Sequence, residues 1–152
     1  MTTIAYDHNA KLIACDSMVT KGDRFLLSST YEEWREDETG IYFFYGRVSD
    51  IDSFMSLSKD KGTKPNDKIM VSALRVDKAG KVFDCGYCND HGYFETILDC
   101  SVAVGSGEDF AISALDFGKS AYEAVKYAST RCIYTGGEIR VYNTTTQQFM
   151  EY

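Results

Sequence analysis

The order in which strand-like and helix-like segments follow one another is the strongest constraint on what this chain can fold into. Residues 3–7 and 11–16 are short apolar runs joined by an Asp-His-Asn-Ala turn, which predicts a β-hairpin. Two more β-rich stretches cover residues 24–28 and 41–45. The acidic, polar segment 32–40 between them is expected to form a solvated turn.

Helical patterns follow these strands in two places. Apolar residues at roughly helical spacing, with Ser49 and Asp50 as candidate caps, predict a helix over 48–59. Segments 68–76 and 81–85 flank Asp-Lys-Ala-Gly and predict a second hairpin. The remaining predictions, in chain order, are a strand at 100–104, a helix after a Gly-Ser-Gly turn at 105–107, a helix at 120–129, strands at 132–135 and 138–143, and a hairpin turn at 144–146.

This order excludes a regular alternation of strands and helices. Helices placed between runs of antiparallel strands pack on the outer faces of stacked sheets, so the pattern predicts an α+β layered fold. With 152 residues, 44% hydrophobic and 14% aromatic, the chain is expected to fold as a single domain over residues 1–152.

Charge and hydropathy exclude two classes of partner. The net charge is −7 and no lysine- or arginine-rich run is present, which argues against nucleic acid and against anionic membrane surfaces. No stretch approaches the roughly 20 apolar residues of a membrane span, and the first residues lack the layout of a signal peptide. We therefore expect a cytoplasmic protein.

The five cysteines are an odd number in a chain long enough to fold without disulfides. Reduced, mostly buried thiols are the expected state. Cys85 and Cys88 have the spacing of half a zinc site, and His91 follows three residues later, so a Cys/Cys/His site remains a minor alternative.

Several segments together carry a resemblance to a known family. Met1 to Tyr6, followed by Ile13 to Ser17 and Val19 to Asp23, resembles the start of proteasome β-subunits and of the bacterial HslV peptidases. Ala103 to Gly107 and Ala128 to Thr135 look like the strand, turn and helical pair in the second half of HslV. The resemblance implies a four-layer αββα sandwich of the N-terminal nucleophile (Ntn) hydrolase type.

The resemblance also implies a catalytic site. Thr2 corresponds to the nucleophile, and removal of Met1 would free its α-amine to act as the base. Asp16 corresponds to the carboxylate that orients the amine, and Gly46 to the backbone oxyanion donor. Ser106 corresponds to the serine that relays a proton beside the amine.

One position departs from the family pattern. The family places a lysine where this chain has Glu33, and a carboxylate there would raise the pKa of the threonine amine and hydroxyl instead of lowering it. Arg35 or Lys21 could supply the charge if the alignment is shifted by two or more residues. A threonine peptidase, a catalytically silent scaffold or binding subunit of the same fold, and an unrelated α+β binding module remain open.

The family resemblance implies partners as well. Ser129, Cys132 and Thr135 have the spacing at which HslV-type subunits offer backbone carbonyls to a monovalent cation such as Na⁺. No other cofactor is expected. The implied partners are further copies of the chain in a homo-oligomeric ring, an AAA+ ATPase unfoldase, and a peptide or protein substrate.

Overall fold

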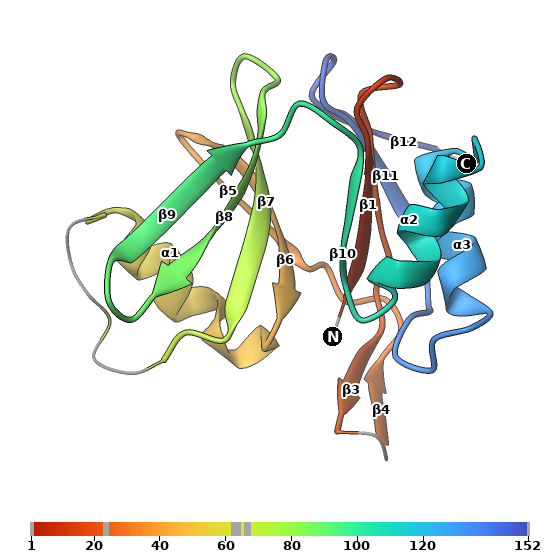
Figure 1. The fold of residues 1–152 in the computed structure, drawn as a ribbon. Helices are drawn as coiled ribbons and strands as arrows, with labels where there is room; N and C mark the ends of the chain where they lie inside the picture. The colour runs from red at the N-terminus through yellow and green to blue at the C-terminus, as the bar shows by residue number, and fades with distance from the viewer. Residues whose placement is uncertain (1, 23–24, 62–64, 66–67, 152) are drawn as a thin grey trace.

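The computed structural model describes residues 2–22, 25–61, 65 and 68–151, and the strands within them form three antiparallel sheets. The predicted N-terminal hairpin is confirmed as β1 (Thr3–Asp7) and β2 (Leu12–Cys15). Both strands lie inside a five-stranded sheet of order β10-β1-β2-β11-β12 (Figure 1). The other members are β10 (Val102–Gly105), β11 (Arg140–Asn143) and β12 (Gln148–Met150).

A second five-stranded sheet has the order β5-β6-β7-β8-β9. Its strands are β5 (Trp34–Asp37), β6 (Gly40–Gly46), β7 (Val71–Asp77), β8 (Val82–Cys88) and β9 (Gly92–Ile97). The prediction of a solvated turn over 32–40 was wrong, because β5 pairs with β6 and places Trp34 opposite Phe43. Strand β9, which is exposed along most of its length, was not predicted.

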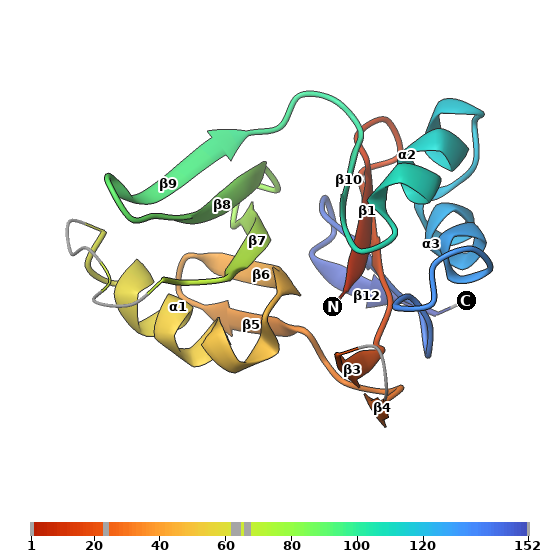
Figure 2. The same cartoon turned by 60° about the horizontal axis from the view of Figure 1, so that its bottom comes forward.

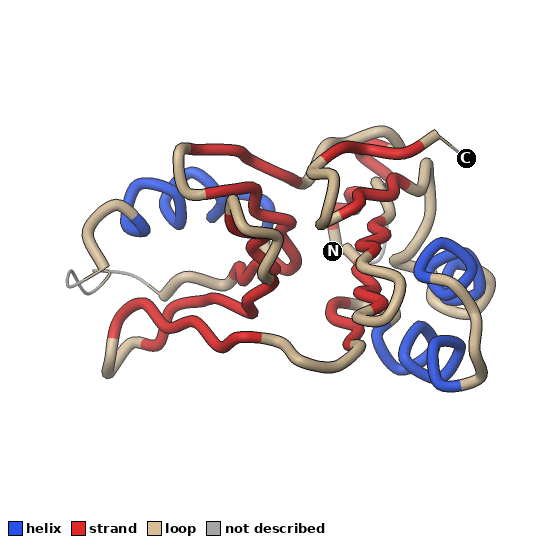
Figure 3. The backbone as a smooth tube through the Cα atoms, turned by 90° about the horizontal axis from the view of Figure 1, so that it is seen from above, coloured by secondary structure: helices blue, strands red, loops and turns tan. Residues whose placement is uncertain are grey.

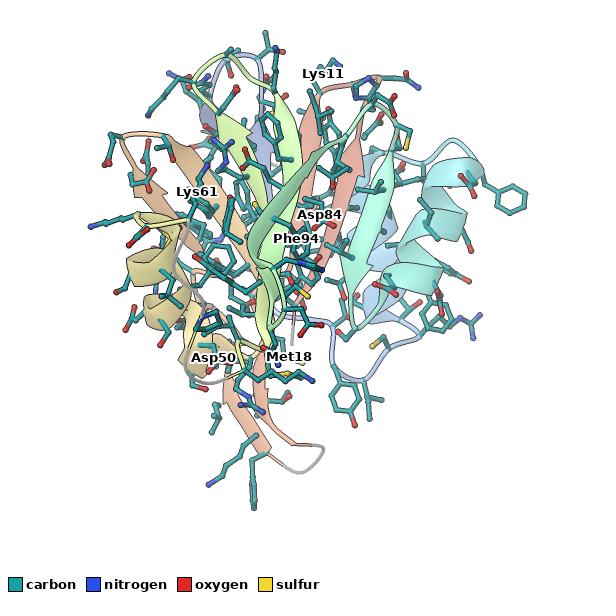
Figure 4. The ribbon with its side chains drawn as sticks, turned by 60° about the vertical axis from the view of Figure 1, so that its left-hand side comes forward. Lys11, Met18, Asp50, Lys61, Asp84 and Phe94 are labelled. Carbon is teal, nitrogen blue, oxygen red and sulfur yellow. The ribbon has the colours of Figure 1, made fainter. Side chains whose placement is uncertain are left out.

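The third sheet is a two-stranded hairpin that projects from one end of the molecule (Figures 1 and 2). It consists of β3 (Val19–Lys21) and β4 (Phe25–Ser28). Figure 4 shows Met18 at the end of the molecule from which this hairpin extends.

In the described part of the chain, three α-helices lie outside the sheets (Figure 3). Helices α2 (Glu108–Asp116) and α3 (Ala121–Ser129) contact β1 of the first sheet, while α1 (Ile51–Ser58), which follows the 3₁₀ turn η1 (Val48–Asp50), lies beside the second. Ser120 caps α3 and forms a reciprocal capping box with Glu123. Asp50 precedes α1 but accepts a hydrogen bond from Met70 instead of capping the helix.

Three apolar clusters hold these layers together. One lies between the two large sheets and includes Ile4, Cys15 and Phe43. A second, built mostly from alanines, joins α2 and α3 to the first sheet, and a third joins α1 to the second sheet. Strand β6 serves two clusters, because Phe43 faces the first sheet while its neighbour Phe44 faces α1.

Two further expectations fail. Residues 132–135 form a turn after α3, not a strand. Only Cys15 and Cys85 are buried among the five free cysteines, so the thiols are not mostly buried.

Cys85 and Cys88 lie three residues apart on β8 and therefore point to opposite faces of the sheet, which argues against a shared zinc site. Among the described residues, no helix is long and apolar enough to cross a membrane.

Candidate active site around Thr2

Thr2 lies directly before β1. Strand β1 starts at the end of the molecule where β10 and β6 finish (Figure 1). Thr2 and Thr3 are both fully buried. The antiparallel pairing of β1 with β10 places Thr3 opposite Gly105, so the Gly-Ser-Gly turn reaches the start of β1. The topology thus gathers Thr2, the end of β2 and the turn after β10 into one place.

Asp16 follows β2 and anchors the start of β1. Its Oδ1 accepts the backbone N–H of Thr3 at 2.8 Å, and its Oδ2 accepts the N–H of Gly136 at 2.8 Å. Burial raises the pKa of Asp16 to about 7, although these two hydrogen bonds oppose the rise. The predicted site residue Asp16 therefore does lie beside Thr2 and Thr3, the threonine pair.

The hydroxyl of Thr3 is the centre of a buried network. It lies 2.7 Å from Thr135 Oγ1 and 3.3 Å from Ser106 Oγ, and it accepts the N–H of Gly107 at 2.8 Å. Ser106 also donates its backbone N–H to the carbonyl oxygen of Thr2 at 3.2 Å. Ser106 is thus at the site, but its hydroxyl contacts Thr3, a residue to which the sequence reading gave no role.

Gly105 allows the turn to approach Thr2 closely. Its φ is +97°, a left-handed value that favours glycine, and an added Cβ would overlap the carbonyl oxygen of Thr2. The sequence signal for this role was present in the Gly-Ser-Gly run, which by itself indicates only a turn. Thr135 was predicted to offer its backbone carbonyl to a cation. In the structure its buried side-chain hydroxyl belongs to the hydrogen-bond network around Thr3.

Glu33, which immediately precedes β5, is also buried, with 2% of its surface exposed. Burial, and then the negative charge of Asp16, raise the pKa of Glu33 to about 8. Its Oε1 and the hydroxyl of Thr2 are the two buried side-chain atoms in the described part of the chain that lack a hydrogen-bond partner.

Neither proposed substitute for the missing lysine pairs with Glu33. The guanidinium of Arg35 donates to Tyr31 and to the carbonyl oxygens of Glu32 and Trp34. Lys21 is exposed at the end of β3. Across the described ranges, no lysine, arginine or histidine forms an ion pair with the Glu33 carboxylate.

Gly46 ends β6 and borders a groove of about 790 Å³. Its φ is +111°, and an added Cβ would lie 2.5 Å from the carbonyl oxygen of Met70, so only glycine fits there. The groove runs between η1 and the projecting hairpin and is also lined by Thr20, Lys21 and Arg47. Gly46 therefore lies at the edge of this groove, and the oxyanion role of its N–H stays a prediction.

The predicted carbonyl ligands of a monovalent cation lie at the end of α3 and in the turn that follows it. Ser129 ends α3, and the carbonyl oxygen of Cys132 accepts the N–H of Thr135 at 3.2 Å. In the part of the chain that the structure describes, no group of three metal-binding side chains is found. Met1, whose removal the mechanism requires, lies outside the described residues.

Comparisons with known proteins bear on the fold. No protein-family model and no curated protein matches the sequence. The structure is similar to the crystal structure of eukaryotic HslV from Trypanosoma brucei, with a TM-score of 0.67 and 18% sequence identity over 99% of each chain. At this identity the likeness concerns the fold alone, and it confirms the resemblance noted in the sequence: this chain has an HslV-like fold.

Proposed function

We propose that the protein is a subunit of a proteasome-like ring whose Thr2 site cleaves peptides weakly or not at all at neutral pH. The observation that supports a threonine site is that buried Thr2 accepts the backbone N–H of Ser106 and directly precedes Thr3, whose N–H is held by Asp16, in an HslV-like fold. We further infer, from the three apolar clusters, the four-layer αββα arrangement of Ntn hydrolases.

Weak activity follows from the charge next to this site. A lysine would hold the pKa of the threonine amine low enough for the amine to act as a base near pH 7. Buried Glu33 acts in the opposite direction, and a shift of one pKa unit changes the fraction of the basic form about tenfold. A catalytically silent scaffold or binding subunit is the limiting case of the same proposal.

Hydrolysis of short fluorogenic peptides by protein that begins at Thr2 tests the proposal. We expect little turnover at pH 7, and at least about tenfold more from the Glu33→Lys variant, because a lysine there reverses the local charge. Thr2→Ala in the Glu33→Lys background should abolish the gain. Rapid turnover by the unsubstituted protein, lost in Thr2→Ala, would contradict weak activity.

The assembly and partners are proposed on the resemblance to HslV. We propose a homo-oligomeric cytoplasmic ring that receives peptide or protein substrates from an AAA+ ATPase unfoldase, with Na⁺ bound by the carbonyls of Ser129, Cys132 and Thr135. Exposed apolar side chains at Phe25, Leu26 and Leu27 of the projecting hairpin favour burial in an assembly. Sedimentation should give a mass several times 17.1 kDa, and a strict monomer at micromolar concentration would refute the ring.

A further inference from the structure

Two orphaned polar atoms lie near the start of β1. Glu33 Oε1 and Thr2 Oγ1 are buried without a partner, although buried polar groups in proteins are nearly always hydrogen-bonded. Glu33 precedes Trp34, which packs against the cluster between the large sheets, and that cluster contains Ile4 and Cys15. Glu33 raises the pKa of the Cys15 thiol, and the pKa of Glu33 is itself influenced by Asp16 and by the N-terminal ammonium group of the chain, so its carboxyl lies near the end of β2 and the start of β1.

We propose that Glu33 is the counter-ion for the α-ammonium group that Thr2 gains when Met1 is removed. The proposal rests on the proposed function, in which Thr2 becomes the first residue. A methionine-specific aminopeptidase would hydrolyse the Met1–Thr2 peptide bond with one water molecule, releasing methionine and leaving the Thr2 ammonium group. That group supplies three N–H donors and a positive charge, and Glu33 Oε1 is an acceptor that lacks a hydrogen-bond partner.

The charged groups that act on this region come from the adjoining elements. They are the buried Asp16 after β2, the buried Cys15 thiol and the N-terminal ammonium group of the chain, which lowers the pKa of Glu33 but leaves it at about 8. Arg140 of β11, which also acts on Cys15, is paired with Glu138. Asp16 is satisfied by two backbone N–H groups, so the unpaired acceptor belongs to Glu33.

Glu33 would act as a positioning residue for the Thr2 ammonium group, and its charge would make the Thr2 amine a weaker catalytic base at neutral pH. A carboxylate beside the ammonium group favours its protonated form and raises the amine pKa above its ordinary value of about 8. The amine would then be a poor base at pH 7 and a better one at higher pH. Peptide cleavage at this site would therefore increase at alkaline pH, in contrast to a site in which a lysine lowers the amine pKa.

NMR titration of two forms of the protein tests the pairing. Both are released from a cleavable fusion partner, one beginning at Met1 and the other at Thr2, with ¹³C in the Thr2 Cα and in glutamate carboxyls. We expect the Glu33 carboxyl to be ionised at pH 7 only in the form that begins at Thr2. We also expect the Thr2 amine to titrate at least about one pH unit above its ordinary value.

Variants assign the effect to Glu33. Glu33→Gln should lower the Thr2 amine pKa by at least about one unit, while Glu32→Gln, at the exposed neighbouring position, should leave it unchanged. If Glu33→Gln fails to fold, Glu33→Met provides the same comparison without a carboxyl. An amine pKa that is indifferent to Glu33, or a Glu33 carboxyl that responds to added sodium or calcium chloride but not to Met1 removal, would overturn the proposal.

Peptide hydrolysis is measured on the same samples from pH 6 to pH 10. Turnover that rises with pH and follows the amine pKa supports the pairing and the threonine site together. A raised amine pKa without turnover at any pH would support the pairing and reduce the proposed function to its catalytically silent form. Rapid turnover at pH 7 would contradict the proposed function whatever the amine pKa, so the two proposals can fail separately.

Discussion

The two sides of the threonine pair differ in how completely their polar groups are satisfied. On the side of β10, Thr3 Oγ1 lies within hydrogen-bonding distance of Ser106, Gly107 and Thr135. On the side of β5, Glu33 Oε1 and Thr2 Oγ1 have no partner. The first side has the features of a rigid structural network, and the second has those of a site that awaits a ligand or a new chain terminus.

This difference separates the residues that build the site from those that would act in it. Asp16 belongs to both sides, because it fixes the backbone of Thr3 and also raises the pKa of Glu33. Changes on the satisfied side should therefore alter mainly folding stability. Changes on the unsatisfied side should alter mainly the pH dependence.

Gly105→Ala should have the largest effect on stability. The new Cβ would overlap the carbonyl oxygen of Thr2 and would be strained at a φ of +97°, so β10 and β1 could not keep their pairing. We expect a loss of about 4 kcal/mol or more in the free energy of unfolding, measured by denaturant titration.

Gly118→Ala is the matched control. Gly118 has a similar φ of +85°, but no atom lies within 4 Å of an added Cβ. It should cost only about 1 kcal/mol, from backbone strain alone. Equal losses in the two variants would mean that the close approach to Thr2 is unimportant.

The second prediction concerns pH and the form that begins at Met1. The pKa of Glu33 is raised by burial to about 8, so the folded state holds a proton that the unfolded state releases near pH 4.5. The stabilisation from this proton is fully present below about pH 4.5 and is lost as the pH rises towards 8. The free energy of unfolding should therefore fall by about 1.4 kcal/mol per pH unit for this group across that window.

Asp16 contributes a slope of the same sign, because its pKa is raised to about 7. Glu33→Gln should remove the Glu33 part of the slope and leave the Asp16 part, while Glu32→Gln should leave both. Denaturant unfolding at pH 5, 6, 7 and 8 measures these slopes. A Glu33→Gln protein with the slope of the unsubstituted chain would show that Glu33 is ionised in the folded state.

The sequence predicted the layers better than it predicted the site. Hydrophobic periodicity located the first hairpin, strand β6 and all three helices, because these elements bury regular apolar faces. Strands β5 and β9 were not predicted, because they lie at the edges of the second sheet and carry polar residues. They are held by backbone pairing, which leaves no apolar pattern in the sequence.

At the site, the resemblance to HslV predicted that Thr2, Asp16 and Ser106 lie close together, and in the structure all three lie at strand ends that the topology joins; their roles stay predictions. It could not reveal that Thr3 holds the hydroxyl network, because hydrogen bonds over more than one hundred residues leave no local signal. The burial of Glu33 was also beyond a local reading, since it precedes a strand that was expected to be a solvated turn.

Thr135→Val should have the smallest effect on the free energy of unfolding. It tests the side of the threonine pair near β10, where the polar groups are hydrogen-bonded. The substitution keeps the volume but removes the hydroxyl 2.7 Å from Thr3 Oγ1, which retains the N–H of Gly107 and the hydroxyl of Ser106. We expect a loss of about 1 kcal/mol in the free energy of unfolding, because the short hydrogen bond to Thr3 and the long one to Ser106, at 3.4 Å, are lost while both partners keep others. The exposed Thr146 serves as the control, and Thr146→Val should be neutral within about 0.5 kcal/mol. The Glu33 carboxyl should titrate unchanged in Thr135→Val, since the Thr135 hydroxyl contacts Thr3 and Ser106 and not the Glu33 carboxyl. A shifted Glu33 titration would show instead that the hydroxyl network and the unpaired carboxyl form one coupled site.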